Sequence, residues 1–118
     1  MVTALPVISE RERHPGGCDT PLVEPDLSVE DAARLAALVK ALADPTRLRV
    51  VDALRKASPE AVCQCELLPL FHISQAALAK HLKVLVTAGL VGMERRGLWA
   101  YYFITDGSSV EELREWLA

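Results

Sequence analysis

Apolar residues recur at helical spacing in two runs that begin after residue 27. Ser28 precedes the first run and Asp44-Pro45 precedes the second, so each run starts with residues that favour a helix N-terminus. The two predicted inward stripes consist of Leu35, Leu38, Val39 and Leu42, and then of Leu48, Val51 and Leu54. The pattern predicts two amphipathic helices, with a loop beginning at about residues 56–60.

A short helix and a longer one are predicted next. The short helix runs from about Cys65 to Phe71, and residues 72–73 form a tight turn. Ser74 then caps a helix that continues to about Ala88, where Gly89 ends it. On a helical wheel, the inward face holds Leu78, Leu82 and Leu85, and the opposite face holds Ala76, Lys80, Lys83 and Thr87.

Residues 90–95 and 99–104 read as two strands joined by a hairpin at residues 96–98. Trp99 and Tyr101 are expected on one face, and Tyr102 and Ile104 on the other, with one face covering the core. Residues 106–109 turn into a last helix with the stripe Val110, Leu113, Trp116 and Leu117. The predicted fold is mainly α with a small β-hairpin (α+β), a winged helix-turn-helix.

Residues 1–26 contain scattered prolines and glycines without periodicity, so we expect a flexible N-terminal arm followed by a domain over residues 27–118. The chain has 118 residues, which suits one domain with a modest core. The N-terminus lacks the pattern of a secretory signal, and no apolar run approaches the ~20 residues of a membrane span. We therefore expect a cytoplasmic protein without a membrane partner.

Charge is distributed unevenly along the chain. The formal net charge is −3, which by itself disfavours DNA binding. Residues 45–104, however, carry eight Lys or Arg and four acids, whereas the remaining residues carry five bases and twelve acids. Phosphate attraction depends on local charge within a Debye length of roughly 8–10 Å, so the basic middle of the chain remains suited to DNA.

Three cysteines, an odd and small number, do not make a disulfide framework, and cytoplasmic thiols stay reduced. Cys63 and Cys65 stand one residue apart where the short helix begins, a position that favours the thiolate. Thiolates are soft ligands for soft metals and metalloids. Two cysteines at this spacing cannot both face the core, so we expect at least one to be exposed or liganded.

Several stretches together resemble the ArsR/SmtB family of metal-sensing repressors, especially its arsenite-responsive branch. They are residues 40–49 (KALADPTRLR), residues 62–67 (VCQCEL), Ser74-Gln75 through His81–Leu85, and residues 89–91 through 96–102. The resemblance covers most of residues 28–118. It implies a homodimer of winged helices that represses an operon and leaves operator DNA when a metal binds. It also implies that Cys63 and Cys65 are metal ligands.

The arsenic repressors that this chain resembles often carry Cys-x-Cys-x-x-Cys, but the third position here is Leu68. Cys18 on the arm is the remaining thiol, so the predicted As(III) or Sb(III) site consists of Cys18, Cys63 and Cys65. Whether Cys18 joins the site of its own subunit or of the partner stays open. A cadmium, lead or zinc sensor, with His14 as a further ligand, is an alternative. Disulfide formation in an oxidant-sensing repressor is another, ranked below metalloid binding.

The predicted DNA-binding residues lie on the longer helix and on the hairpin. Ser74, Gln75 and Ala76 stand at the start of that helix, where Gln can pair with adenine. Lys80 and Lys83 are expected on phosphates, and His81 either on a phosphate or packed against the preceding helix. Arg95 and Arg96 are expected in the minor groove or on the backbone at the wing. Arg47 and Arg49 could add phosphate contacts, although a solvated helix face explains them slightly better.

Two other functional classes fit the sequence less well. No nucleophile–base signature or glycine-rich phosphate loop occurs, and a thiol oxidoreductase would show Cys-x-x-Cys beside a βαβ pattern, so we expect no enzyme. A winged helix that binds only proteins is disfavoured by the basic middle segment. A steep loss of DNA affinity with rising salt would separate a DNA binder from such a module.

Overall fold

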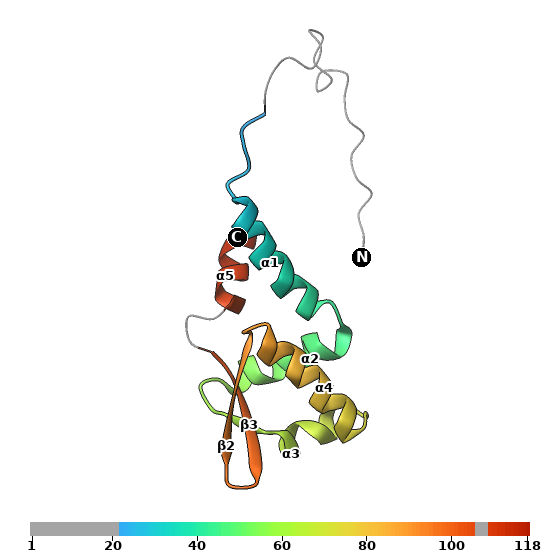
Figure 1. Ribbon diagram of the computed structural model, residues 1–118. Coiled ribbons are helices and arrows are strands. Elements are labelled where there is room, and N and C mark those ends of the chain that lie inside the picture. Colours follow the sequence, from blue (N-terminus) through green and yellow to red (C-terminus); the bar gives the residue numbers. More distant parts are fainter. Residues whose placement is uncertain (1–21, 106–108) are drawn as a thin grey trace.

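Helices dominate the computed structural model, which describes residues 22–105 and 109–118. The described elements are α1 (Val29–Leu42), α2 (Pro45–Ala57), β1 (Val62–Cys63), α3 (Gln64–Leu67), the 3-10 helix η2 (Leu68–Leu70), α4 (Gln75–Thr87), β2 (Val91–Arg96), β3 (Trp99–Ile104) and α5 (Ser109–Leu117). Figure 1 shows α1 and α5 side by side at one end and the β2–β3 hairpin at the other. This order confirms the predicted α+β winged helix-turn-helix.

Helices α1, α2 and α4 begin directly after the predicted capping residues, and α4 ends one residue before the predicted Ala88. Ser28 Oγ, Asp44 Oδ2 and Ser74 Oγ each accept a hydrogen bond from the backbone N–H three residues later, at 3.0 Å. Gly89 follows α4 with φ +80°, a conformation that glycine adopts without strain. The tight turn before α4 is also confirmed, with His72 at φ +42°. These features are local, which is why the sequence predicted them.

The inward face of α4 is confirmed. Leu78, Leu82 and Leu85 are fully buried and belong to one cluster with Val50 and Leu54 of α2. Burying each such leucine contributes about 1.5–3 kcal/mol relative to exposure. The core therefore fixes which face of α4 remains available to a partner.

The predicted inward orientation of two residues, one in α1 and one in α2, is wrong. Val39 is 46% exposed and Leu48 is 52% exposed. In α2 the buried face runs through Val50, and Leu48 lies about 160° around the helix from it at 3.6 residues per turn. In α1 the buried positions include Ala41, and Val39 lies beside that stripe.

The sheet has a third strand that the sequence did not predict. Its strand order is β1-β3-β2, with all pairs antiparallel. Cys63 of β1 pairs with Tyr101, so the cysteine segment is hydrogen-bonded to the hairpin. Strand β2 extends one residue further than expected, to Arg96, and Gly97 at φ +65° leads the turn. Tyr102 is buried and Trp99 is exposed, which identifies the core-facing side of the hairpin.

The last helix was predicted correctly in position and partly in orientation. Val110 and Leu113 of α5 pack against the core, whereas Trp116 and Leu117 are 51% and 69% exposed. Arg34 of α1 forms an ion pair with Glu112, which ties α5 to α1. Residues 106–108 of the predicted turn lie outside the described residues. None of the described helices has the length and hydropathy needed to cross a membrane.

Candidate functional site

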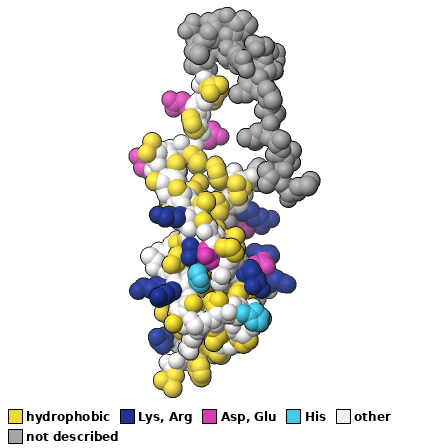
Figure 2. All heavy atoms as spheres, turned by 90° about the vertical axis from the view of Figure 1, so that its right-hand side faces the viewer, with side chains coloured by type: hydrophobic (Ala, Val, Ile, Leu, Met, Phe, Trp, Pro, Cys, Tyr) yellow, Lys and Arg dark blue, Asp and Glu magenta, His cyan; other side chains and the backbone are white. Residues whose placement is uncertain are grey.

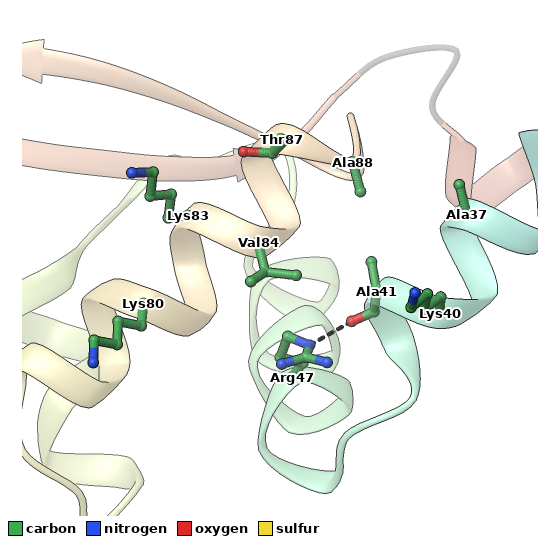
Figure 3. A pocket seen from close by; sticks show the side chains of 9 residues that line it. All are labelled: Ala37, Lys40, Ala41, Arg47, Lys80, Lys83, Val84, Thr87 and Ala88. Carbon is green, nitrogen blue, oxygen red and sulfur yellow. Dashed lines mark hydrogen bonds between the residues drawn. The ribbon is translucent and has the colours of Figure 1, made fainter.

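The exposed face of α4 brings most of the predicted DNA-binding residues together. Ser74 caps the helix, and Gln75 and Ala76 are exposed in its first turn. Lys80 and Lys83 are exposed further along, and Figure 3 shows both side chains directed away from α1 and α2. Figure 2 shows Lys and Arg side chains gathered on both flanks of the lower part of the molecule. Ala76, Lys80 and Lys83 thus lie opposite the buried leucines of α4, and Gln75 is exposed in its first turn.

His81 differs from its neighbours on α4. Its side chain is 24% exposed, and its Nδ1 lies 3.3 Å from Arg47 Nη1 and 4.0 Å from Asp44 Oδ2. The hydrogen bond from the Arg47 backbone N–H to Asp44 holds the pKa of that carboxyl below its usual range. Arg49 lies over the Phe71 ring at 5.2 Å from its centroid. His81, Arg47 and Arg49 therefore all have contacts inside the protein.

The two arginines of the wing are in different environments. Arg96 donates from Nε to Glu94 Oε1 at 2.7 Å and lies over the Tyr101 ring, 4.4 Å from its centroid. Arg95 has no hydrogen bond or ion pair within the described part of the chain, and it is exposed. Arg95 can therefore meet an external anion without breaking an internal contact, whereas Arg96 has to share its charge with Glu94.

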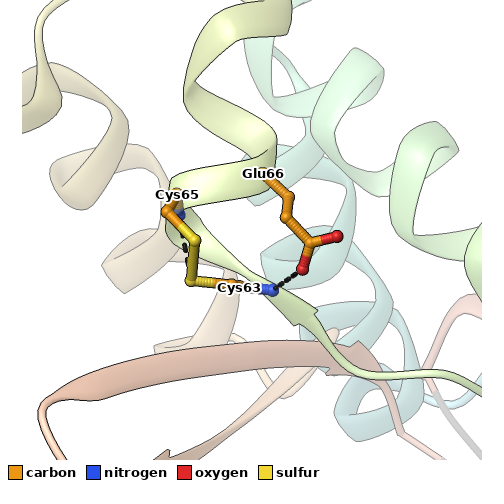
Figure 4. Close-up of a disulfide and its surroundings, with 3 residues drawn as sticks. All are labelled: Cys63, Cys65 and Glu66. Carbon is orange, nitrogen blue, oxygen red and sulfur yellow. Dashed lines mark hydrogen bonds between the residues drawn. A yellow bond between two sulfur atoms is a disulfide. The ribbon is translucent and has the colours of Figure 1, made fainter.

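Cys63 and Cys65 meet at the junction of β1 and α3, where their sulfur atoms form a disulfide (Figure 4). Cys63 is buried, and its Sγ accepts a hydrogen bond from the Cys65 backbone N–H at 3.2 Å. Glu66 Oε1 accepts in turn from the Cys63 N–H at 3.0 Å. Cys65 is exposed, in line with the expectation for cysteines at this spacing. The backbone at the junction of β1 and α3 therefore holds the two sulfur atoms next to each other.

A cavity of about 550 Å³ adjoins the cysteine pair. The cysteines and Leu68 form one wall, Gln75 and Ala79 of α4 form another, and the wing closes it with residues that include Arg95, Leu98, Trp99 and Tyr102. The sequence did not predict this cavity, because it depends on the pairing of β1 with β3. It places the cysteines beside residues from both elements expected to read DNA.

The third predicted ligand, Cys18, lies outside the described residues, as does His14. Over residues 22–105 and 109–118, no three His, Cys, Asp or Glu side chains come together as a metal site. The described part of the chain therefore supplies two of the three predicted thiols. Their sulfur atoms are the donors that a soft ion prefers, and the ion needs a further ligand.

Comparison with known proteins identifies relatives over most of the chain. Residues 44–92 match the model of the bacterial regulatory protein, arsR family. A transcriptional repressor SmtB homolog from Synechocystis is 33% identical over 107 residues, covering 83% of this chain and 79% of that protein. The arsenical resistance operon repressor of Bacillus subtilis is 39% identical over 67 residues, covering 57% of this chain and 62% of that protein.

Solved structures agree with these relatives. HlyU from Vibrio cholerae superposes with a TM-score of 0.65 at 27% identity, covering 76% of this chain and 94% of that one. An ArsR-like transcriptional regulator from Rhodococcus gives 0.62 at 27% identity, covering 75% and 80%. The relatives are transcription regulators, not enzymes. With its helix-turn-helix and wing, the chain belongs to the ArsR/SmtB family of DNA-binding transcriptional repressors.

Proposed function

We propose that this repressor binds operator DNA as a cytoplasmic homodimer and is released when As(III) or Sb(III) binds Cys63, Cys65 and Cys18. The observation that carries the proposal is the meeting of both sulfurs beside the cavity that also contacts Gln75 and Arg95. The similarity to an arsenical resistance operon repressor supports the choice of ion. Because Leu68 stands where a third cysteine would complete a local site, the proposal includes Cys18 as the third ligand.

Reduction of the disulfide by two cellular thiols, which are themselves oxidised to a disulfide, makes both sulfurs available. Arsenous acid, As(OH)₃, then condenses with three thiols to a tris-thiolate and releases three waters. Cys65 is the exposed partner and is therefore the first sulfur that an ion from solution reaches.

The cavity places the proposed inducer site next to residues that are proposed to contact DNA. An ion held by Cys63 and Cys65 would lie beside this cavity, which is lined by the start of α4 and by the wing. Gln75 and Arg95 line that space, so movement of either one changes base or phosphate contacts directly. A coupling of roughly 1–3 kcal/mol, or 5- to 150-fold in DNA affinity, is typical of such linkage.

In the DNA complex we assign Gln75 and Ala76 to base edges and Lys80 and Lys83 to phosphates. Ser74 keeps the helix N-terminus in place, and Arg95 contacts the backbone or the minor groove at the wing. Arg96 adds a weaker contact because Glu94 already shares its charge.

Dimerisation is supported by an apolar groove between α1 and α5. Val39 and Trp116 line this groove, of about 330 Å³, and both are about half exposed. Leu117, 69% exposed, lies next to Trp116 in the sequence. A second copy of the chain would cover these side chains, as in other homodimers with apolar interface cores.

The test is release of a fluorescently labelled operator, followed by anisotropy in a phosphine-reduced buffer. Arsenite should weaken DNA binding of the wild type by 5- to 150-fold, in the range typical of allosteric coupling. Cys63→Ser and Cys65→Ser should bind DNA normally and show no release. Glu60→Gln, in the loop before β1, is the matched control and should respond like the wild type. Normal release from either serine variant would overturn the proposal.

Cys18 has its own test in the same assay. Cys18→Ala should retain DNA binding and require a higher arsenite concentration for release. An unchanged arsenite response would remove Cys18 from the site. Parallel titrations with cadmium, lead and zinc salts address the alternative inducers, since a family relative is an SmtB homolog. Release by one of these ions at a lower concentration than arsenite would replace As(III) with that ion.

A second candidate function is favoured by the disulfide itself. Oxidation of Cys63 and Cys65 to the bonded form could release DNA without any ion. Diamide in the absence of reductant distinguishes the two candidates. Release by diamide that a phosphine reverses supports redox sensing. Release by arsenite only, under reducing conditions, supports the metalloid function.

A further inference from the structure

Arg47 joins three helices at one corner of the molecule. It lies in the first turn of α2, and its Nε donates to the Ala41 carbonyl oxygen in the last turn of α1 at 2.6 Å. Figure 3 shows this hydrogen bond and the direction of the guanidinium. The Nη1 atom of the same group lies 3.3 Å from His81 Nδ1 on α4. A single side chain therefore connects the ends of α1 and α2 to the middle of the recognition helix.

Asp44 fixes the base of this corner. Its Oδ2 accepts from the Arg47 backbone N–H at 3.0 Å and lies 4.0 Å from His81 Nδ1. The N-cap thus holds the first turn of α2, from which the Arg47 side chain extends. Because Arg can only donate, His81 Nδ1 has to be the acceptor in the Arg47 contact.

His81 is thereby distinguished from the cations beside it. Lys80 and Lys83 are exposed and point away from this corner, whereas His81 is mostly covered by it. A side chain that contacts Arg47 and Asp44 is poorly placed to act as a phosphate donor at the same time. The contact spans 34 residues of sequence, so it restrains α4 relative to elements far away in the chain.

We propose that Arg47 and His81 are positioning residues that set the placement of α4 against the α1–α2 corner, and through it the operator spacing that the dimer accepts. The inference rests on the proposed dimeric repressor. Recognition helices of a dimer enter successive major grooves, about 34 Å apart, so their separation has to match the half-site spacing. Since α1 carries part of the proposed dimer face, a firm link from α1 to α4 transmits the dimer geometry to the DNA-reading helix.

The experiment uses a duplex selected from a random-sequence library by the full-length protein, without any inducer. Two further duplexes have one base pair added or removed between the half-sites. Wild type should bind the selected spacing at least about tenfold more tightly than the altered ones, a difference of about 1.4 kcal/mol. His81→Leu, which removes the acceptor, should bind the three duplexes with nearly equal affinity. His81→Asn, whose side-chain oxygen can accept from Arg47, should restore the discrimination.

The dependence of affinity on salt separates positioning from direct contact. Lys80→Gln is the matched control on the same helix, and it should lower the slope of log K against log salt by about 0.9 while preserving spacing discrimination. His81→Leu should leave that slope unchanged. A slope lowered by about 0.9 with intact discrimination would make His81 a phosphate contact and overturn the proposal.

Circular dichroism checks that His81→Leu retains the helical content of the wild type, and Arg47→Gln provides an independent loss of the same contact. Arg47→Gln should match His81→Leu in spacing discrimination, and unchanged discrimination in a folded Arg47→Gln protein also overturns the proposal. Because no inducer is present, a failure of arsenite sensing leaves these outcomes intact. Equal binding of all three duplexes by the wild type would instead reject both the dimeric operator complex and the positioning role.

Discussion

The two parts of α4 face different surroundings. Its first turn borders the cysteine cavity, where Gln75 lies opposite the wing and Cys65 is exposed. Its middle is held by His81, whose Nδ1 lies 3.3 Å from Arg47 and which is mostly buried. The first turn of α4 thus borders two cysteines, whose bonding changes on oxidation or ion binding. The middle of α4 is held by the contacts of His81, which involve neither cysteine. The difference suggests how a ligand could tilt one end of a helix whose other part stays fixed.

The largest expected effect comes from removing the core that both parts of α4 share. Leu82→Ala deletes a fully buried side chain and should destabilise the protein by about 2–5 kcal/mol. Denaturant unfolding measures the loss. Val39→Ala, at an exposed position of α1, should change the stability of the monomer by no more than about 0.5 kcal/mol. Equal effects of the two substitutions would show that the buried leucine row does not hold α4.

Leu68→Cys should strengthen arsenite binding at the cysteine pair beside the first turn of α4. Leu68 lines the cysteine cavity and stands where the arsenic repressors that this chain resembles often carry a third cysteine. The variant should bind arsenite about tenfold more tightly, a gain of about 1.4 kcal/mol, because a third sulfur then belongs to the same turn of chain. Arsenite titration of the Leu68→Cys protein with and without Cys18→Ala checks this. If Cys18→Ala weakens arsenite binding of the Leu68→Cys protein as much as it weakens that of the wild type, the local thiol is not reaching the ion.

The wing offers a smaller contrast, between Arg95 and Arg96. Arg95→Gln should reduce the salt slope of operator binding by about 0.9, since it removes a phosphate contact from an arginine without an internal partner in the described residues. Arg96→Gln should reduce it by less, because Glu94 already compensates part of that charge. Anisotropy titrations at several salt concentrations provide both slopes. A larger effect at Arg96 would contradict this assignment.

The smallest expected effect is on the pH dependence of stability, through Asp44 beside the Arg47–His81 contact. The pKa of Asp44 is lowered, first by the backbone hydrogen bond from Arg47, so its ionised form is favoured in the folded state. This contribution to stability is fully present above the usual carboxyl pKa of about 4 and is lost as the pH falls through the lower, folded-state value. Asp44→Asn should flatten the decline of unfolding free energy in that acidic range. An unchanged acid limb in denaturant unfolding would show that the cap has no such role.

The sequence predicted what depends on neighbouring residues. Ser28, Asp44 and Ser74 were identified as caps because their partners lie three residues away, and the leucines of α4 because they repeat along one helix. Leu48 and Val39 were misplaced, since an apolar residue beside a stripe looks the same as one within it. The cap residues therefore mark helix starts more reliably than apolar spacing marks the buried face.

Features that join distant segments were not visible in the sequence. A two-residue strand such as β1 leaves no alternation to detect, yet it sets the cysteines against the wing. The contact between Arg47 and His81 likewise depends on how α2 crosses α4. The two local cysteines of the candidate site were predicted from their spacing. The third ligand, Cys18, stays a prediction, because it lies outside the described residues.

Hydrogen–deuterium exchange of the reduced protein, with and without arsenite, tests most directly whether the inducer acts through the cysteine side of α4. Backbone exchange reports local opening along the chain. Arsenite should slow exchange in residues 62–68 and alter it in residues 75–79 and 95–99. Residues 41–47 and 81–85 should exchange as before. A change confined to the Arg47–His81 corner, or no change around Cys63 and Cys65, would contradict the account.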